Sequence, residues 1–137
     1  MHPRAILGFV RHCHGDLHLA NIALANGQLL LFDAIEFDPS IATTDILYDL
    51  AFTLMDMVHF GQGHAVKALF NRYLSGAADD HLDSLGLLPL FLSIRAAIRA
   101  HVLFTRSDQV AHGEAAWLEA KRYFDLADVS SSRSRRA

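Results

Sequence analysis

The sequence has a single cysteine, Cys13, and its only lysines are Lys67 and Lys121. One cysteine excludes an internal disulfide, as is usual for proteins of a reducing compartment. A net charge of −3 gives no general reason to expect nucleic-acid binding, which a basic domain or stripe usually marks. A secretory signal is also lacking, because the apolar run at residues 5–10 is too short for one. We therefore expect a cytoplasmic protein without a nucleic-acid partner.

Long uninterrupted apolar runs are missing as well. The most apolar stretch, residues 85–104, contains Arg95 and Arg99, so we predict a core helix with a polar edge and no membrane span or membrane partner. With 137 residues and 52% hydrophobic composition, the chain is large and apolar enough for one domain with its own core.

The clearest local signal is the pair Asn26-Gly27 between two apolar runs. This pair is preferred in the two-residue type I′ turn of a β-hairpin. A hairpin over residues 22–32 with this turn sets Asn21 opposite Phe32, so Asn21 and Asp33 lie together at its open end. Facing residues across such a pair have Cβ atoms roughly 4.5 to 5.5 Å apart, which is close enough for neighbouring side chains such as those of Asn21 and Asp33 to share one cation.

The residue types at this end of the hairpin indicate phosphate chemistry. Amide and carboxylate oxygens are hard ligands that suit Mg²⁺, which takes its other ligands from water and substrate phosphates. Asp16 lies five residues before Asn21, in a loop opened by Gly15, and can reach the same place. A catalytic-loop Asp, an Asn five residues later and a metal-binding Asp beyond them are parts that protein kinases use.

The chain resembles the carboxyl-terminal lobe of the aminoglycoside phosphotransferase family, small-molecule kinases with a protein-kinase-like fold. The resemblance is sharpest over residues 11–58. It rests on three segments: His14-Gly15-Asp16-Leu17-His18 followed by Asn21, then Leu31-Phe32-Asp33, and then Tyr48-Asp49-Leu50-Ala51. Residues 32–39 resemble the branch of the family that often occurs joined to a P-loop ATP-binding domain, so such a domain is an expected partner. Ala34 and Ile35 depart from the family pattern after Asp33.

The resemblance implies a role for each site residue. Asp16 matches the catalytic base, and Asn21 and Asp33 match the two Mg²⁺ ligands. Asp49 matches a buried helix Asp that braces the catalytic loop, and His14 matches a residue that helps to fix this loop. The implied donor is ATP or GTP, and the implied acceptor is the hydroxyl of a small molecule. For His18 and Asp56 several interpretations stay open: His18 is a second loop-stabilising imidazole or is exposed, and Asp56 is a solvated residue or a substrate contact.

A kinase of this kind also needs an amino-terminal lobe with a Lys that pairs with the nucleotide phosphates. No lysine precedes His14. We therefore expect residues 1–129 to form a partial domain, a catalytic lobe that depends on a nucleotide-binding lobe in cis or in trans and has negligible activity alone.

The remaining sequence predicts a mostly helical α+β fold. Residues 6–10 fit a strand or the end of a helix, and Thr44 and Asp45 both fit as N-cap of the first long helix. We predict helices at residues 46–60, 64–74, 87–105 and 109–127, loops at 34–44 and 77–84, and a disordered Ser/Arg tail at 130–137.

Two other kinds of function remain open from the sequence. His12, His14, Asp16 and His18 are close to the His-x-His-x-Asp-His cluster with which metallo-hydrolases hold zinc, although the last His is one residue late. Alternatively, the chain keeps the shape of a kinase lobe and serves as a non-catalytic binding or regulatory module. The hypothesis that Cys13 is a nucleophile has less support, because a lone Cys is more often a small buried hydrophobic residue.

Overall fold

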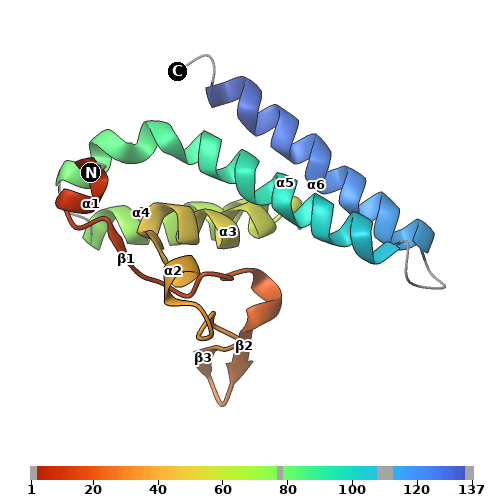
Figure 1. The fold of residues 1–137 in the computed structure, drawn as a ribbon, viewed down its shortest axis with the longest axis horizontal. Coiled ribbons are helices and arrows are strands. Elements are labelled where there is room, and N and C mark those ends of the chain that lie inside the picture. Colours follow the sequence, from red (N-terminus) through yellow and green to blue (C-terminus); the bar gives the residue numbers. More distant parts are fainter. Residues whose placement is uncertain (1–2, 77–78, 108–112, 135–137) are drawn as a thin grey trace.

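The chain folds into an α+β structure that is mostly helical, with two small two-stranded sheets (Figure 1). The structure is a computed structural model, and it describes residues 3–76, 79–107 and 113–134. In chain order the elements are α1 (Pro3–Ile6), β1 (Val10–His12), the 3₁₀ helix η1 (Leu19–Asn21), β2 (Ile22–Ala25), β3 (Gln28–Leu31), α2 (Pro39–Ala42), β4 (Thr43–Asp45), α3 (Ile46–His59), α4 (Gly63–Gly76), the 3₁₀ helix η2 (Asp79–Leu87), α5 (Leu88–Ser107) and α6 (Gly113–Ser134).

The predicted hairpin is present as β2 and β3, which pair antiparallel from Ile22 opposite Leu31 to the turn. Asn26 and Gly27 both have positive φ, 51° and 75°. This is the conformation that a type I′ turn requires at both central residues. The turn prediction is therefore confirmed.

The second sheet joins segments that the sequence did not pair. β1 runs antiparallel to β4, with Val10 opposite Asp45. Residues 10–12 are thus a strand, and α1 ends before it at Ile6. The predicted loop at residues 34–44 contains the short helix α2, where the Asp38 side chain caps the Ser40 N–H.

α3 begins where the sequence indicated. Of the two N-cap candidates, Asp45 has this role, because its carboxylate accepts a hydrogen bond from the Leu47 N–H at 2.9 Å. The same carboxylate pairs with Arg4 of α1, whose Nη2 lies 2.8 Å from Asp45 Oδ1. The amino-terminal segment is thereby attached to the start of α3.

The core lies between α3, α5 and α6. In Figure 1, α5 and α6 run side by side, and α3 lies against α5. Small side chains on α5 and α6 permit this close packing around the larger ones. The buried core residues are Phe52, Met55, Ala96, Ala100, Tyr123 and Ala127.

Two helical segments differ from the expected loops and tail. η2 covers part of the predicted loop at 77–84. α6 continues to Ser134, five residues into the segment expected to be disordered, and Ser130 is buried in it. Residues 135–137 lie outside the described residues.

One helical segment of the described chain, Ser84–Arg106, is long and apolar enough to cross a membrane by length and composition alone. Core helices of soluble proteins, which are mostly buried, pass the same test, whereas 17% of the apolar window of this segment is buried. Its residue Arg95 makes its contacts inside the fold, with Gly15, Tyr48 and Asp49.

Candidate active site

Side chains of α3 hold the loop that carries Asp16. Asp49, in the first turn of α3, is buried and accepts two backbone hydrogen bonds from this loop. The His14 N–H donates to Asp49 Oδ2 and the Gly15 N–H donates to Oδ1, each at 3.1 Å. The contact expected of Asp49 as a loop brace is thus present, and its importance for catalysis stays a prediction.

Gly15 permits the sharp bend at the start of the loop. Its φ is +84°, a left-handed conformation that residues with a Cβ rarely adopt. A Cβ at this residue would lie 3.0 Å from Ile35 Cδ1, so the packing is also tight. Ile35 is fixed there by its N–H, which donates to the His14 carbonyl at 2.9 Å.

Asp16 and Asn21 are in direct contact. The Asn21 Nδ2 donates to the Asp16 carbonyl oxygen at 2.9 Å and lies 3.3 Å from Asp16 Oδ2. Asn21 is buried, whereas 40% of the Asp16 side chain is exposed. With its nitrogen toward Asp16, the Asn21 amide directs its oxygen to the other side.

Asp33 follows the hairpin strand that pairs with Asn21. The Phe32 N–H donates to the Asn21 carbonyl at 3.1 Å, which is the pairing that the turn predicted. Asp33 is exposed and has a φ of 59°. Among the described residues we find no hydrogen bond to its carboxylate, so its oxygens are available to a ligand.

His14 links the loop that carries Asp16 to this end of the hairpin. Its Nε2 lies 2.8 Å from the Phe32 carbonyl oxygen, and its Nδ1 lies 3.3 Å from the Asp16 backbone nitrogen. Since a carbonyl only accepts, the Nε2 carries the proton and the Nδ1 accepts from Asp16. The His14 imidazole therefore spans from Asp16 to the residue before Asp33.

His18 is a buried loop residue, which resolves a point that the sequence left open. Its Nδ1 accepts from the Ala20 N–H at 3.2 Å, and its Nε2 lies 3.4 Å from Asp16 Oδ2. Burial lowers the pKa of His18, although the carboxylate of Asp16 acts in the opposite direction. The Ala20 N–H needs an unprotonated Nδ1, and a proton on Nε2 points to Asp16 Oδ2, so this tautomer satisfies both contacts.

Asp56 is neither of the two things considered from the sequence. It is 2% exposed, so a solvated position is excluded. Its Oδ2 accepts from the Leu19 N–H at 2.9 Å and its Oδ1 accepts from the Tyr123 hydroxyl at 2.8 Å. One turn earlier, the Thr53 hydroxyl donates to the Leu17 carbonyl at 2.7 Å. A row of α3 side chains thus holds the loop along its length.

Arg95 of α5 is a part of the site that the sequence did not indicate. Its side chain is buried and contacts the loop through Gly15 and the helix α3 through Tyr48 and Asp49. Asp56 and Arg95 both lie far in sequence from the loop, and no local pattern connects them to it.

The side-chain types of Asn21 and Asp33 are those of an Mg²⁺ site more than of a zinc site. Asn21 and Asp33 offer one amide and one carboxylate oxygen, which suit an ion that keeps waters and binds phosphates. Within the described ranges no three His, Cys, Asp or Glu side chains gather into a metal-binding group. The zinc cluster considered at residues 12–18 thus has no support among the described residues.

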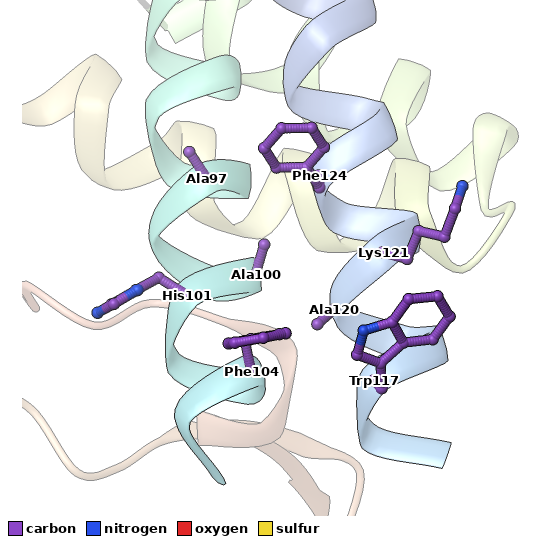
Figure 2. A pocket seen from close by; sticks show the side chains of 8 residues that line it. All are labelled: Ala97, Ala100, His101, Phe104, Trp117, Ala120, Lys121 and Phe124. Carbon is purple, nitrogen blue, oxygen red and sulfur yellow. The ribbon is translucent and has the colours of Figure 1, made fainter. Parts of the chain in front are cut away.

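An apolar cavity lies elsewhere, on α5 and α6. It has a volume of about 390 Å³ and an apolar lining in which alanines leave space between Phe104, Trp117 and Phe124 (Figure 2). None of the candidate site residues lines it.

Comparisons with known proteins identify relatives without an assigned activity. Uncharacterized protein Rv2004c of Mycobacterium tuberculosis (strain H37Rv) is 32% identical over 98 residues, which is 70% of this chain. Uncharacterized protein Mb2027c of Mycobacterium bovis matches to the same extent. The chain spans only 19% of the length of these relatives. No family model and no solved structure matches the chain.

Proposed function

We propose that residues 1–129 are the kinase-like catalytic lobe of an ATP- and Mg²⁺-dependent phosphotransferase that resembles the aminoglycoside phosphotransferases and acts on the hydroxyl of a small molecule. One observation carries this proposal. Asp16 contacts Asn21, and the backbone of Phe32, the residue before Asp33, contacts Asn21 and His14 of the same loop. The proposal further requires that the Asp33 carboxylate turns toward Asn21.

In this proposal Asp16 orients the acceptor hydroxyl and takes its proton. Its partly exposed carboxylate is accessible to a substrate, and the Asn21 and His18 side chains restrict its orientation. In phosphoryl transfer the protein mainly positions groups and balances charge, so a fixed carboxylate is what the reaction needs. Asn21 and Asp33 would hold Mg²⁺, which supplies positive charge to the phosphate oxygens when it is bound.

In this proposal the nucleotide binds to a second lobe, which supplies the Lys that pairs with the phosphates. That lobe belongs to the same polypeptide or to a partner that includes a P-loop domain. The much greater length of the mycobacterial relatives supports such an arrangement, because they have ample additional chain. A cytoplasmic setting, where ATP is abundant, is part of the same proposal. In this proposal the residues that select the acceptor lie outside the loop described above.

Activity measurements test the proposed base. We expect negligible phosphotransfer by the purified 137-residue chain. In a complete enzyme that joins it to its nucleotide-binding lobe, Asp16→Ala should lower the rate by on the order of 10² to 10⁴ if Asp16 accepts the proton. Asp125→Ala removes an exposed carboxylate of α6 and is the matched control, which should retain activity. Unchanged turnover in Asp16→Ala would refute the assignment.

The metal ligands are tested on the chain itself. Mn²⁺ is a paramagnetic substitute for Mg²⁺. In an NMR titration it should broaden the amide signals of Asn21 and Asp33 before those of the acidic residues elsewhere in the chain. Asp33→Ala should abolish this selective broadening, whereas Asp125→Ala should not. Broadening that begins at the acidic side chains of α6 would contradict the site.

A further inference from the structure

Arg95 makes an unusual set of contacts for a core side chain. It lies in the middle of α5, is only 6% exposed, and reaches the loop that carries Asp16 across 80 residues of sequence. Its Nη2 donates to the Gly15 carbonyl at 3.4 Å, and its Nε donates to the Tyr48 carbonyl at 3.3 Å. The same Nη2 lies 3.7 Å from Asp49 Oδ1.

Burying this guanidinium is unfavourable unless it is fully compensated. Burial lowers the pKa of Arg95, while the charges of Asp49 and Asp16 oppose that effect. Compensation comes from the carboxylate of Asp49 and from two aromatic faces, since the guanidinium carbon lies 4.0 Å from the Tyr48 ring centre and 4.6 Å from that of Phe52. A buried ion pair is weak evidence for stability, because apolar side chains of similar volume are often as good or better. Stability alone therefore does not account for an arginine here.

The contacts of Arg95 converge on the peptide that precedes Asp16. The Gly15 N–H donates to Asp49, and the Gly15 carbonyl accepts from Arg95. Both polar groups of this glycine are thus held, one by α3 and the other by α5. Glycine has more backbone freedom than any other residue. Because the N–H and the carbonyl of Gly15 are both held, the orientation of the next residue, Asp16, is fixed as well.

We propose that Arg95 is a positioning residue that fixes the orientation of Asp16: it donates to the Gly15 carbonyl while Asp49 accepts from the Gly15 N–H. This inference rests on the proposed role of Asp16 for its catalytic meaning. The planar fork of arginine suits it to two carbonyls and a carboxylate at once, and lysine cannot reproduce that geometry.

Amide hydrogen exchange of the 137-residue chain tests the proposal without any assay of activity. In Arg95→Met and in Arg95→Lys, protection of the His14 and Gly15 amides should fall by on the order of tenfold more than that of α3 amides between residues 52 and 55. Arg106→Met, at the exposed end of the same helix, is the control and should leave the loop protected.

Chemical rescue separates positioning from a general loss of packing. In Arg95→Ala, millimolar guanidinium should restore loop protection by filling the space between the two rings, and methylammonium should not. Equal loss of protection in the loop and in α3, or full protection in Arg95→Lys, would overturn the proposal. If Arg95→Met does not fold, the lysine variant decides.

Kinetics of a complete enzyme distinguish this inference from the proposed function. Arg95→Lys should lower kcat by on the order of tenfold or more with little change in the KM for ATP, because a misplaced base affects the transition state more than nucleotide binding. If loop protection depends on Arg95 but Asp16→Ala leaves turnover intact, the proposed function fails and the positioning role stands.

Discussion

At the scale of single residues, the site depends on buried carboxylates that accept hydrogen bonds from the loop backbone. Asp49 and Asp56 each accept from loop N–H groups, at opposite ends of the segment that contains Asp16. Hydrogen bonds to a charged acceptor are stronger than neutral ones, and an unpaired buried charge would be costly. Each carboxylate therefore stabilises the loop and needs the loop in return.

The hydroxyl of Tyr123 should make stability depend on pH above neutrality. Burial, followed by its hydrogen bond to Asp56, raises the pKa of Tyr123 above its ordinary value. The folded state thus keeps a proton that the unfolded state releases near pH 10. The stabilisation is complete below about pH 10 and decreases as pH rises above it, by about 1.4 kcal/mol per pH unit.

Tyr123→Phe measures this effect by urea unfolding at several pH values. At pH 8 the variant should be less stable by about 1 to 2 kcal/mol, because Asp56 loses a donor. The difference should shrink by pH 11, since only the wild type loses stability through Tyr123. Any contribution of Tyr73, whose pKa burial also raises, is common to both proteins. A difference that stays constant with pH would contradict the explanation.

At the scale of elements, the hairpin turn controls where Asp33 lies. Gly27→Ala introduces no steric contact, because nothing lies within 4 Å of the added Cβ, but it strains a backbone with a φ of +75°. We expect a loss of about 1 to 2 kcal/mol. Amide NMR shifts should change at Asn21 and Asp33, the open end of the hairpin.

Gly63→Ala provides the matched control for the turn. Gly63 begins α4, also has open space around its Cβ, and does not have positive φ. The substitution should be neutral or slightly stabilising in thermal unfolding, because alanine restricts the unfolded chain and favours the helix. Equal destabilisation by the two substitutions would show that turn strain is not the cause.

The elements that were predicted well from the sequence are those with a local cause. Asn26-Gly27 determines the turn, and Asp45 caps α3 through a contact two residues away. The pairing of β1 with β4 could not be predicted from the sequence, because each strand has three residues and the two lie more than thirty residues apart. The extent of α6 was underestimated for a similar reason: Ser130 is buried by tertiary packing, which overrides its polar composition.

At the scale of the whole molecule, one helical core supports the site. α3 supplies the loop contacts on one side and packs with α5 and α6 on the other. Met55, fully buried in this core, lies one residue before Asp56. The loop and the helices should therefore behave as one cooperative unit.

Met55→Ala tests this cooperativity. Removing a fully buried methionine should cost about 2 to 5 kcal/mol of unfolding free energy. Amides of the loop and of α3 should lose protection from exchange by the same factor. Val58→Ala, on an exposed part of the same helix, should change stability by less than about 0.5 kcal/mol. Loop amides that keep their protection in Met55→Ala would separate the two parts.

The candidate site residues could be anticipated because they lie within a short stretch of sequence joined by a hairpin. The contacts of Asp56 and Arg95 with the loop could not be predicted in this way, since a buried Asp or Arg in a helix has the same local sequence pattern as one on a polar edge. Only the tertiary packing of α3 and α5 on the loop distinguishes them. Sequence reasoning thus proposes candidate reactive groups more readily than the groups that hold the loop in place.

The left-handed backbone of Asp33 has a consequence for protein engineering. Asparagine and aspartate tolerate this conformation better than other residues with a side chain, so the backbone and the proposed cation select the same short polar group. An exchange for glutamate, conservative in charge, alters reach and strains the main chain together. An exchange for asparagine removes charge alone, and it is the cleaner way to separate electrostatics from shape at this residue.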